Sequence, residues 1–151
     1  MMAGKTAVIF YSSTGNTEAM AEAVAVGARS CGADVLLASV SDVDAETIGK
    51  EYDCILLGCS AWGVEVIEEA QMKPFSKKLE PFLKGKYMGV FGSCGWSRGA
   101  WLNSWESELH FAGGIFPAAP VRAYGYPDEE SLKACEELGK TVVKEAENAS
   151  V

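Results

Sequence analysis

A hydroxyl-rich stretch near the N-terminus holds the residue types best suited to bind an anion. It consists of Ser12, Ser13, Thr14, Gly15, Asn16 and Thr17. The stretch follows the apolar run 7–11 and precedes a segment with helical periodicity, so it forms a strand-to-helix corner. Free backbone N–H groups and the helix dipole both favour negative charge at such a corner. The loop has no Lys or Arg and lacks the Gly-Lys-Ser/Thr ending of a Walker loop, so it predicts a phosphate monoester held by neutral donors. The alternative is a helix N-cap that binds nothing.

Two tryptophans lie in glycine-containing loops, each of which follows a strand predicted to be buried. Trp62 precedes Gly63, and Trp96 follows Gly95. A polar loop that exposes a tryptophan is unusual unless the ring covers something. Two such rings beside a phosphate site predict a flat aromatic ligand stacked between them. The alternative is that both rings fold back onto the core or close a protein interface.

The other reactive side chains argue against several chemistries. The chain has one histidine, His110, and five cysteines without a C-x-x-C pair, which argues against a zinc or iron–sulfur site. We predict buried, reduced thiols at most of these cysteines. No acid–base set can be identified, so we predict no catalytic residue and no metal ligand. A net charge of −8 argues against nucleic-acid binding and favours docking to a basic protein surface.

Strands and helices alternate along the 151 residues. The predicted strands cover residues 7–11, 34–40, 53–59, 87–91 and 115–124, and the predicted helices cover 17–31, 46–50, 74–83, 101–111 and a last segment capped by Asp128. Because Pro117 and Pro120 cannot donate to a ladder, the fifth strand should be an edge strand or be broken by a bulge. The alternation predicts one α/β domain over residues 1–151, a five-stranded parallel sheet with helices on both faces. No apolar run reaches the ~20 residues of a membrane helix and no signal peptide is evident, so we expect a cytoplasmic protein.

The three unusual loops follow the first, third and fourth predicted strands. In a parallel sheet these strands all end at the same edge, and ligands bind there, at the topological switch point. The sequence therefore predicts a single site built from all three loops.

These loops also carry a family resemblance. Y-S-S-T-G-N-T-E (11–18), L-L-G-C-S-A-W-G-V-E (56–65) and V-F-G-S-C-G-W-S-R-G (90–99) resemble the three flavin loops of the flavodoxins. The chain lacks the fifth-strand insertion of long-chain members, so it resembles a short-chain, clostridial-type flavodoxin. The resemblance implies a flavodoxin-like three-layer sandwich with strand order 2-1-3-4-5. It also implies a low-potential electron-transport flavoprotein, which carries one electron at a time on non-covalently bound FMN, between semiquinone and hydroquinone.

The resemblance further implies roles for individual residues. Residues 12–17 and Ser60 would hold the FMN phosphate. The second loop would face the ring through Ala61, Trp62, Gly63, Val64 and Glu65, with Gly63 at the flavin N5 and Glu65 at N3. The third loop would contribute Ser93, Cys94, Gly95 and Trp96, with Trp96 on the outer face of the ring. The chain departs from the family at Trp62, Cys94 and Arg98, where methionine, tyrosine and a neutral or acidic residue are usual.

Further expectations concern the surroundings of this site. Glu68 and Glu69 follow the second loop and are predicted to lie on an ordinary solvated surface. The expected partners are redox proteins with basic docking surfaces that meet the flavin edge transiently, with no nucleic acid or membrane involved, and a monomer is expected. Two alternatives remain open: an NAD(P)H-dependent quinone or FMN reductase on the same fold, and a flavin-free interaction protein.

Overall fold

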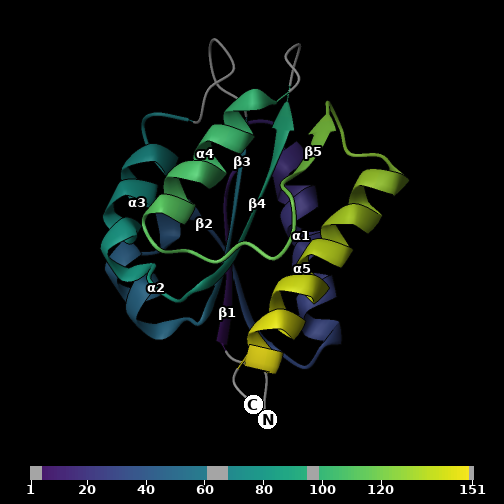
Figure 1. The fold of residues 1–151 in the computed structure, drawn as a ribbon. Coiled ribbons are helices and arrows are strands. Elements are labelled where there is room, and N and C mark those ends of the chain that lie inside the picture. Colours follow the sequence, from purple (N-terminus) through teal and green to yellow (C-terminus); the bar gives the residue numbers. More distant parts are fainter. Residues whose placement is uncertain (1–4, 61–67, 95–98, 150–151) are drawn as a thin grey trace.

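A single parallel sheet forms the centre of the molecule. The computed structural model describes residues 5–60, 68–94 and 99–149. The strands are β1 (Lys5–Tyr11), β2 (Asp34–Ser39), β3 (Cys54–Ser60), β4 (Tyr87–Cys94) and β5 (Val121–Tyr124), and they lie in the order β2-β1-β3-β4-β5 (Figure 1). Every neighbouring pair is parallel. The predicted strand order is confirmed.

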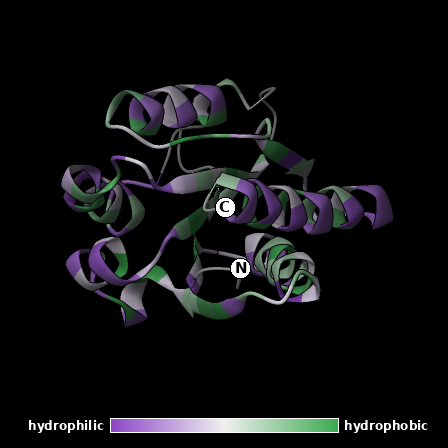
Figure 2. Ribbon diagram, turned by 60° about the horizontal axis from the view of Figure 1, so that its bottom comes forward, coloured by the Kyte–Doolittle hydropathy of each residue, from purple (hydrophilic) through white to green (hydrophobic). Residues whose placement is uncertain are grey.

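Helices cover both faces of this sheet (Figure 1). They are α1 (Asn16–Ser30), α2 (Ala45–Glu51), α3 (Met72–Leu79), α4 (Ala100–Phe111) and α5 (Glu129–Ala149), with short 3₁₀ turns at Val40–Asp42 and Glu80–Phe82. One face carries α1 and α5, and the other carries α2, α3 and α4. Figure 2 shows their apolar sides turned toward the sheet and their polar sides turned outward. In the described residues, no helix is long and apolar enough to cross a membrane.

The central strands are buried along nearly their whole length, as their apolar composition predicts. All seven residues of β3 are buried, and so are the middle residues of β1 and β4. The edge strand β2 is half-buried over most of its length. Cys54, Cys59, Cys94 and Cys135 are buried thiols and Cys31 is half-buried.

The fifth strand is shorter than the sequence predicts. Only Val121–Tyr124 pairs with β4, while Ile115 makes an isolated bridge to Tyr87. Pro117 and Pro120 lie between these two contacts, where neither has to donate to a ladder. The predicted strand over 115–124 was therefore too long, and its predicted position at the edge of the sheet is confirmed.

The face that carries α1 and α5 is packed through glycines. A Cβ on Gly27 of α1 would overlap the carbonyl oxygen of Glu136, and one on Gly139 of α5 would overlap the carbonyl oxygen of Val24. The two helix backbones thus lie in direct contact. This packing fixes the position of α1, whose first two residues, Asn16 and Thr17, belong to the hydroxyl-rich stretch.

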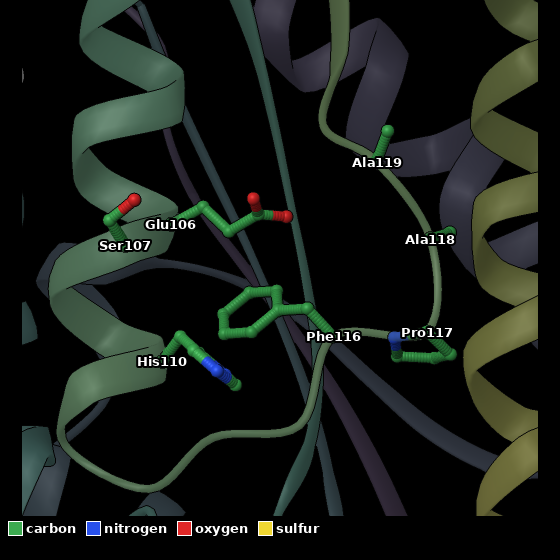
Figure 3. A pocket seen from close by; sticks show the side chains of 7 residues that line it. All are labelled: Glu106, Ser107, His110, Phe116, Pro117, Ala118 and Ala119. Carbon is green, nitrogen blue, oxygen red and sulfur yellow. The ribbon is translucent and has the colours of Figure 1, made fainter.

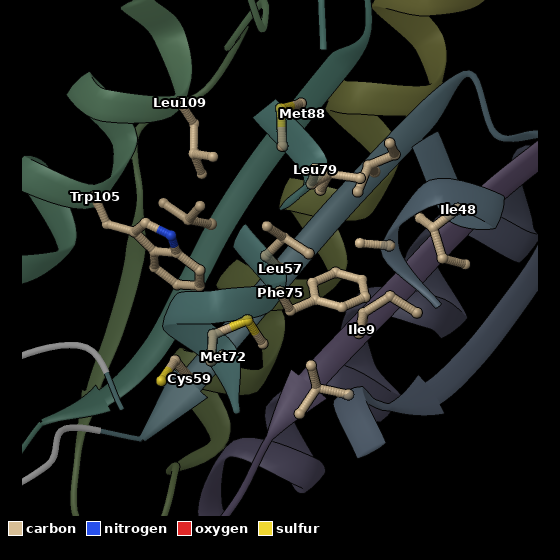
Figure 4. Close-up of a cluster of buried hydrophobic side chains, with 14 of the residues drawn as sticks. Ile9, Ile48, Leu57, Cys59, Met72, Phe75, Leu79, Met88, Trp105 and Leu109 are labelled. Atoms are coloured by element: carbon tan, nitrogen blue, oxygen red, sulfur yellow. The ribbon is translucent and has the colours of Figure 1, made fainter. Parts of the chain in front are cut away.

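The opposite face is filled by large side chains. Trp101 and Trp105 of α4 stack with ring centroids 6.3 Å apart, and the indole N–H of Trp105 donates to the hydroxyl of Ser76 on α3 over 3.0 Å. Figure 4 shows Trp105, Met72, Phe75 and Leu79 in the core between these helices and the sheet. Buried side chains, together with one buried hydrogen bond, hold α3 and α4 together.

Aspartates cap two of the helices, and one of them is the predicted cap at Asp128. The carboxylate of Asp44 accepts from the backbone N–H of Thr47 at 3.0 Å, at the start of α2. Asp128 accepts from the N–H of Ser131 at 2.8 Å, at the start of α5. These hydrogen bonds, chiefly the one from the Ser131 backbone, lower the pKa of Asp128.

Candidate functional site

The ends of β1, β3 and β4 meet at one edge of the sheet. Tyr11 at the end of β1 pairs with Cys59, and Ser60 at the end of β3 pairs with Ser93. The carboxyl ends of β1, β3 and β4 therefore lie side by side (Figure 1). The predicted convergence of the three loops is confirmed for the described strand ends.

The first loop wraps the amino end of α1. Gly15 stands at the N-cap with φ 94°, a left-handed conformation that favours glycine. The hydroxyl of Ser12 accepts from the backbone N–H groups of Gly15 at 3.0 Å and Glu18 at 3.3 Å. One hydroxyl is thus sufficient to cap the helix, which leaves the other donors of the loop available.

A buried hydroxyl pair joins the first loop to the end of β3. Thr17 is fully buried and Ser60 is nearly so, and their side-chain oxygens lie 2.8 Å apart. The backbone N–H of Ser13 also donates to the Ser60 hydroxyl, over 3.4 Å. Two residues that are 43 positions apart in the sequence therefore share one hydrogen-bonded unit.

The remaining donors of this loop face open space. Ser13, Thr14 and Gly15 are exposed, and a Cβ on Gly15 would meet nothing within 4 Å. Within the described part of the chain, no acceptor is found for the backbone N–H groups of Thr14, Asn16 and Thr17. These N–H groups and hydroxyls fit a phosphate monoester, because they are neutral donors at the positive end of a 15-residue helix.

The end of β4 and the start of α4 form the opposite side of the site. Ser93 and Cys94 are buried at the end of β4. Gly99 begins α4 with φ 75°, and a Cβ at that position would lie 2.9 Å from the Cys94 sulfur and 3.4 Å from the side chain of Arg122. Glycine at 99 therefore lets the start of α4 approach the end of β4 closely.

Several predicted site residues lie outside the described residues. They are Ala61, Trp62, Gly63, Val64, Glu65, Gly95 and Trp96, and Arg98 is outside as well. For these positions the expectations rest on the sequence.

The expectation that Glu68 is solvated was wrong. Its side chain is 2 % exposed, and its carboxylate accepts from the backbone N–H groups of Ala70, Gln71 and Met72 at 2.6 to 2.8 Å. Glu69 is exposed and forms an ion pair with Lys73 at 3.8 Å, as a surface residue would. The sequence gives one signal for the difference. Glu68 stands just before the start of a helix, where a carboxylate can satisfy free N–H groups.

The carboxylate of Glu68 also acts on its neighbours. The pKa of Tyr11, at the end of β1, is raised by burial and, to a smaller extent, by the negative charges of Glu68 and Cys59. Burial raises the pKa of the Cys59 thiol to about 12. Glu68 therefore lies beneath the edge where the first and second loops start.

A second hollow of about 360 Å³ lies between α4 and the segment 115–120 (Figure 3). His110 and Glu106 line it, with Phe116 between them in the view. The ring Nδ1 of His110 lies 2.9 Å from the carbonyl oxygen of Gly114, a partner that the sequence did not identify. None of the predicted site residues lines this hollow.

The fold and the first loop together define a class of α/β protein, one that holds a phosphate ester at the carboxyl edge of a parallel sheet. The flavodoxin family profile matches residues 8–139. The flavodoxin of Clostridium beijerinckii is 38% identical over 89% of this chain and 96% of its own length. That of Megasphaera elsdenii is 36% identical over 91% of this chain and 97% of its own.

A solved structure of the two-electron reduced Megasphaera elsdenii flavodoxin superposes with a TM-score of 0.83, at 35% identity, and covers 92% of this chain and 98% of that one. The chain belongs to the flavodoxin family. Flavodoxins are electron-transfer proteins that bind FMN, and the residues of the first loop fit the phosphate of that cofactor.

Proposed function

We propose that this chain is a low-potential, one-electron carrier that acts as a single domain and holds FMN non-covalently at the carboxyl edge of its sheet. The observation that carries the proposal is the hydroxyl pair of Thr17 and Ser60, which joins the predicted phosphate loop to the strand that leads into the second loop. When bound, FMN supplies the redox chemistry and the protein supplies position and electrostatics.

The phosphate end of the cofactor would be held by residues 12–17. In this arrangement the backbone N–H groups of Thr14, Asn16 and Thr17, with the exposed hydroxyls of Ser13 and Thr14, would donate to the phosphate oxygens. Ser60 would hold Thr17 and Ser13 in place from beneath. Because no described residue of this loop is cationic, the charge of the phosphate would remain largely uncompensated and would oppose reduction of the flavin.

The ring end of the cofactor would lie between the second and third loops. Ser93 and Cys94 are the last residues of β4, where the third loop starts, and both are buried. Ala61, Trp62, Gly63, Val64, Glu65, Gly95 and Trp96 would complete it, with Trp62 and Trp96 on the two faces of the ring. Support for these roles comes from the order and spacing of the three loops.

The partners would be redox proteins that dock transiently at the flavin edge through basic surfaces. The net charge of −8 supports attraction to such surfaces. We further propose that the chain acts as a monomer. A cytoplasmic location is supported by its five reduced thiols.

Two titrations test this function. FMN and riboflavin, which lacks the phosphate, are titrated into the cofactor-free protein, and we expect FMN to bind far more tightly. Thr17→Val should erase much of that preference, whereas Ser41→Ala, at an exposed hydroxyl outside the site, should keep it. Equal binding of FMN and riboflavin would contradict the phosphate assignment, and no binding of either would contradict the function.

The second titration is an anaerobic reduction of the FMN-loaded protein followed by visible absorbance. Two resolved one-electron steps at low potential support the carrier. A single two-electron step together with rapid NAD(P)H oxidation would instead support a reductase.

A further inference from the structure

Glu68 lies between the second loop and the start of α3 in the sequence. The residue is 2 % exposed, and its carboxylate accepts from three consecutive backbone N–H groups, those of Ala70 (2.6 Å), Gln71 (2.7 Å) and Met72 (2.8 Å). Its backbone carbonyl accepts from the N–H of Lys73 at 2.9 Å. Hydrogen bonds to an ionised group are stronger than neutral ones, so residue 68 is tightly bound to the start of α3.

Cys59 ties the same residue to the sheet. The backbone N–H of Glu68 donates to the Cys59 sulfur over 3.4 Å, and the Cys59 thiol donates to the carbonyl oxygen of Ser60 over 3.2 Å. Figure 4 shows Cys59 next to Met72 at the carboxyl end of β3. With its pKa at about 12, the thiol keeps its proton at neutral pH and can donate continuously.

The contact between Cys59 and Glu68 therefore brings together the two ends of the segment that lies between them. Fixing the separation of two residues that flank a loop lowers the entropic cost of binding a ligand through that loop. A carboxylate that only capped α3 would require neither full burial nor a link to β3.

We propose that Glu68 is a positioning residue, and that it forms with Cys59 a clasp that holds the start of α3 against the end of β3, the two elements that flank the second loop in the sequence. Through this clasp Glu68 sets the affinity for the ring end of FMN without touching the cofactor. The inference deepens the proposed function and rests on it. It also separates the two ends of the site, because Ser60 links to the phosphate loop through different atoms, its own hydroxyl and those of Thr17 and Ser13.

The variant that tests the clasp is Glu68→Gln, with Glu69→Gln as the matched control at the adjacent exposed position. An amide keeps the size of the side chain but loses the charge and places an NH₂ group against backbone donors. We expect Glu68→Gln to weaken FMN binding about tenfold, as for the loss of one charge-assisted hydrogen bond. Binding of inorganic phosphate to the cofactor-free protein should stay unchanged. Glu69→Gln should alter neither affinity.

Hydrogen exchange of the cofactor-free protein supplies a readout that does not need FMN. Glu68→Gln should speed exchange in the peptide that contains residues 61–67 and in the first turn of α3, but not in residues 12–17 or in α4. If the wild-type protein fails to bind FMN, the proposed function is wrong, and the exchange pattern still decides whether the clasp exists.

Cys59→Ala and Glu68→Asp keep the inference testable if Glu68→Gln does not fold. Cys59→Ala leaves the capping carboxylate in place and removes only the link to β3, and it should reproduce the selective loss of FMN affinity. Glu68→Asp keeps the charge and should restore part of the affinity. Unchanged FMN binding in Cys59→Ala, or an equal loss of FMN and phosphate binding in Glu68→Gln, would overturn the proposal.

Discussion

The two faces of the sheet are held by different means. On one face α1 and α5 touch backbone to backbone at Gly27 and Gly139. On the other face α3 and α4 pack through large side chains, many of them aromatic. The hydrogen bond between Trp105 and Ser76 joins the two helices. A backbone contact leaves little room for adjustment, whereas side chains can change rotamer.

This difference corresponds to the two ends of the site. The first loop runs directly into α1, on the face held by backbone contact. The second and third loops lead into α3 and α4, on the face held by side chains, and there Glu68 adds a carboxylate that fixes the start of α3. The rigid face thus positions the residues proposed to hold the phosphate, and the more adjustable face carries the segments predicted to meet the ring.

The largest expected effect comes from separating α1 and α5. Gly27→Ala or Gly139→Ala places a methyl group on the partner's carbonyl oxygen, so the helices must move apart. We expect the free energy of unfolding to fall by about 3 kcal/mol in each case. Chemical denaturation measures this, with Val26→Ala, an exposed position on the same helix, as the control. If the free energy of unfolding fell by less than in the Thr17→Val and Ser76→Ala variants described below, the contact between α1 and α5 would not be rigid.

The next largest effect concerns the hydrogen bond between Thr17 in the first loop and Ser60 at the end of β3. Thr17→Val preserves shape but, among the described residues, leaves the buried Ser60 hydroxyl with its longer contact to the Ser13 N–H. We expect a loss of about 2 kcal/mol in the free energy of unfolding, from an unsatisfied buried group. Thr47→Val removes an exposed hydroxyl and should cost much less. Denaturation of both cofactor-free variants compares them, and equal losses would argue against a structural role for the Thr17 hydroxyl.

A smaller effect is expected where side chains hold the opposite face. Ser76→Ala leaves the buried indole N–H of Trp105 without its acceptor, but alanine favours the helix. The net loss should be about 1 kcal/mol in the free energy of unfolding. Ser104→Ala, at an exposed position of α4, is the control. A loss as large as that of Gly27→Ala would show that both faces are equally rigid.

The smallest effect is a dependence of stability on pH at the start of α5. The pKa of Asp128 is lowered in the folded protein by its hydrogen bonds to Ser131, so its carboxylate stabilises the fold above its ordinary pKa of 3.8. This contribution is lost as the pH falls through the lowered value. We expect wild type and Asp128→Ala to differ at neutral pH and to converge in strong acid, as measured by thermal unfolding. A difference that persists in acid would contradict a role for the charge.

Much of the fold follows from local patterns in the sequence. Apolar runs such as 53–59 predict buried strands, and the alternation with helices predicts a parallel sheet. The aspartate caps at Asp44 and Asp128 were also predictable, because short-range hydrogen bonds depend on adjacent residues alone. The hydroxyl-rich loop could be recognised as an anion site because its donors are consecutive in the sequence.

Other features depend on contacts that no local pattern reveals. The position of Glu68 before a helix is compatible with a cap, but its burial beside the exposed Glu69 depends on its contact with Cys59 at the end of β3. The hydrogen bond between Thr17 and Ser60 requires β1 and β3 to be neighbours. The length of β5 depends on where the chain around Pro117 and Pro120 meets the edge of the sheet.

The sequence by itself determined the element order, the sheet edge at which the three loops start and the prediction that residues 12–17 bind phosphate, since each depends on neighbouring residues. Only the tertiary structure decided that Ser60 supports Thr17, that α1 rests on α5 through glycines, and that Glu68 is a buried anchor bonded to Cys59. These are pairings between distant segments, and their energy comes from burial and hydrogen bonds that form only when the sheet and its two helix layers are assembled.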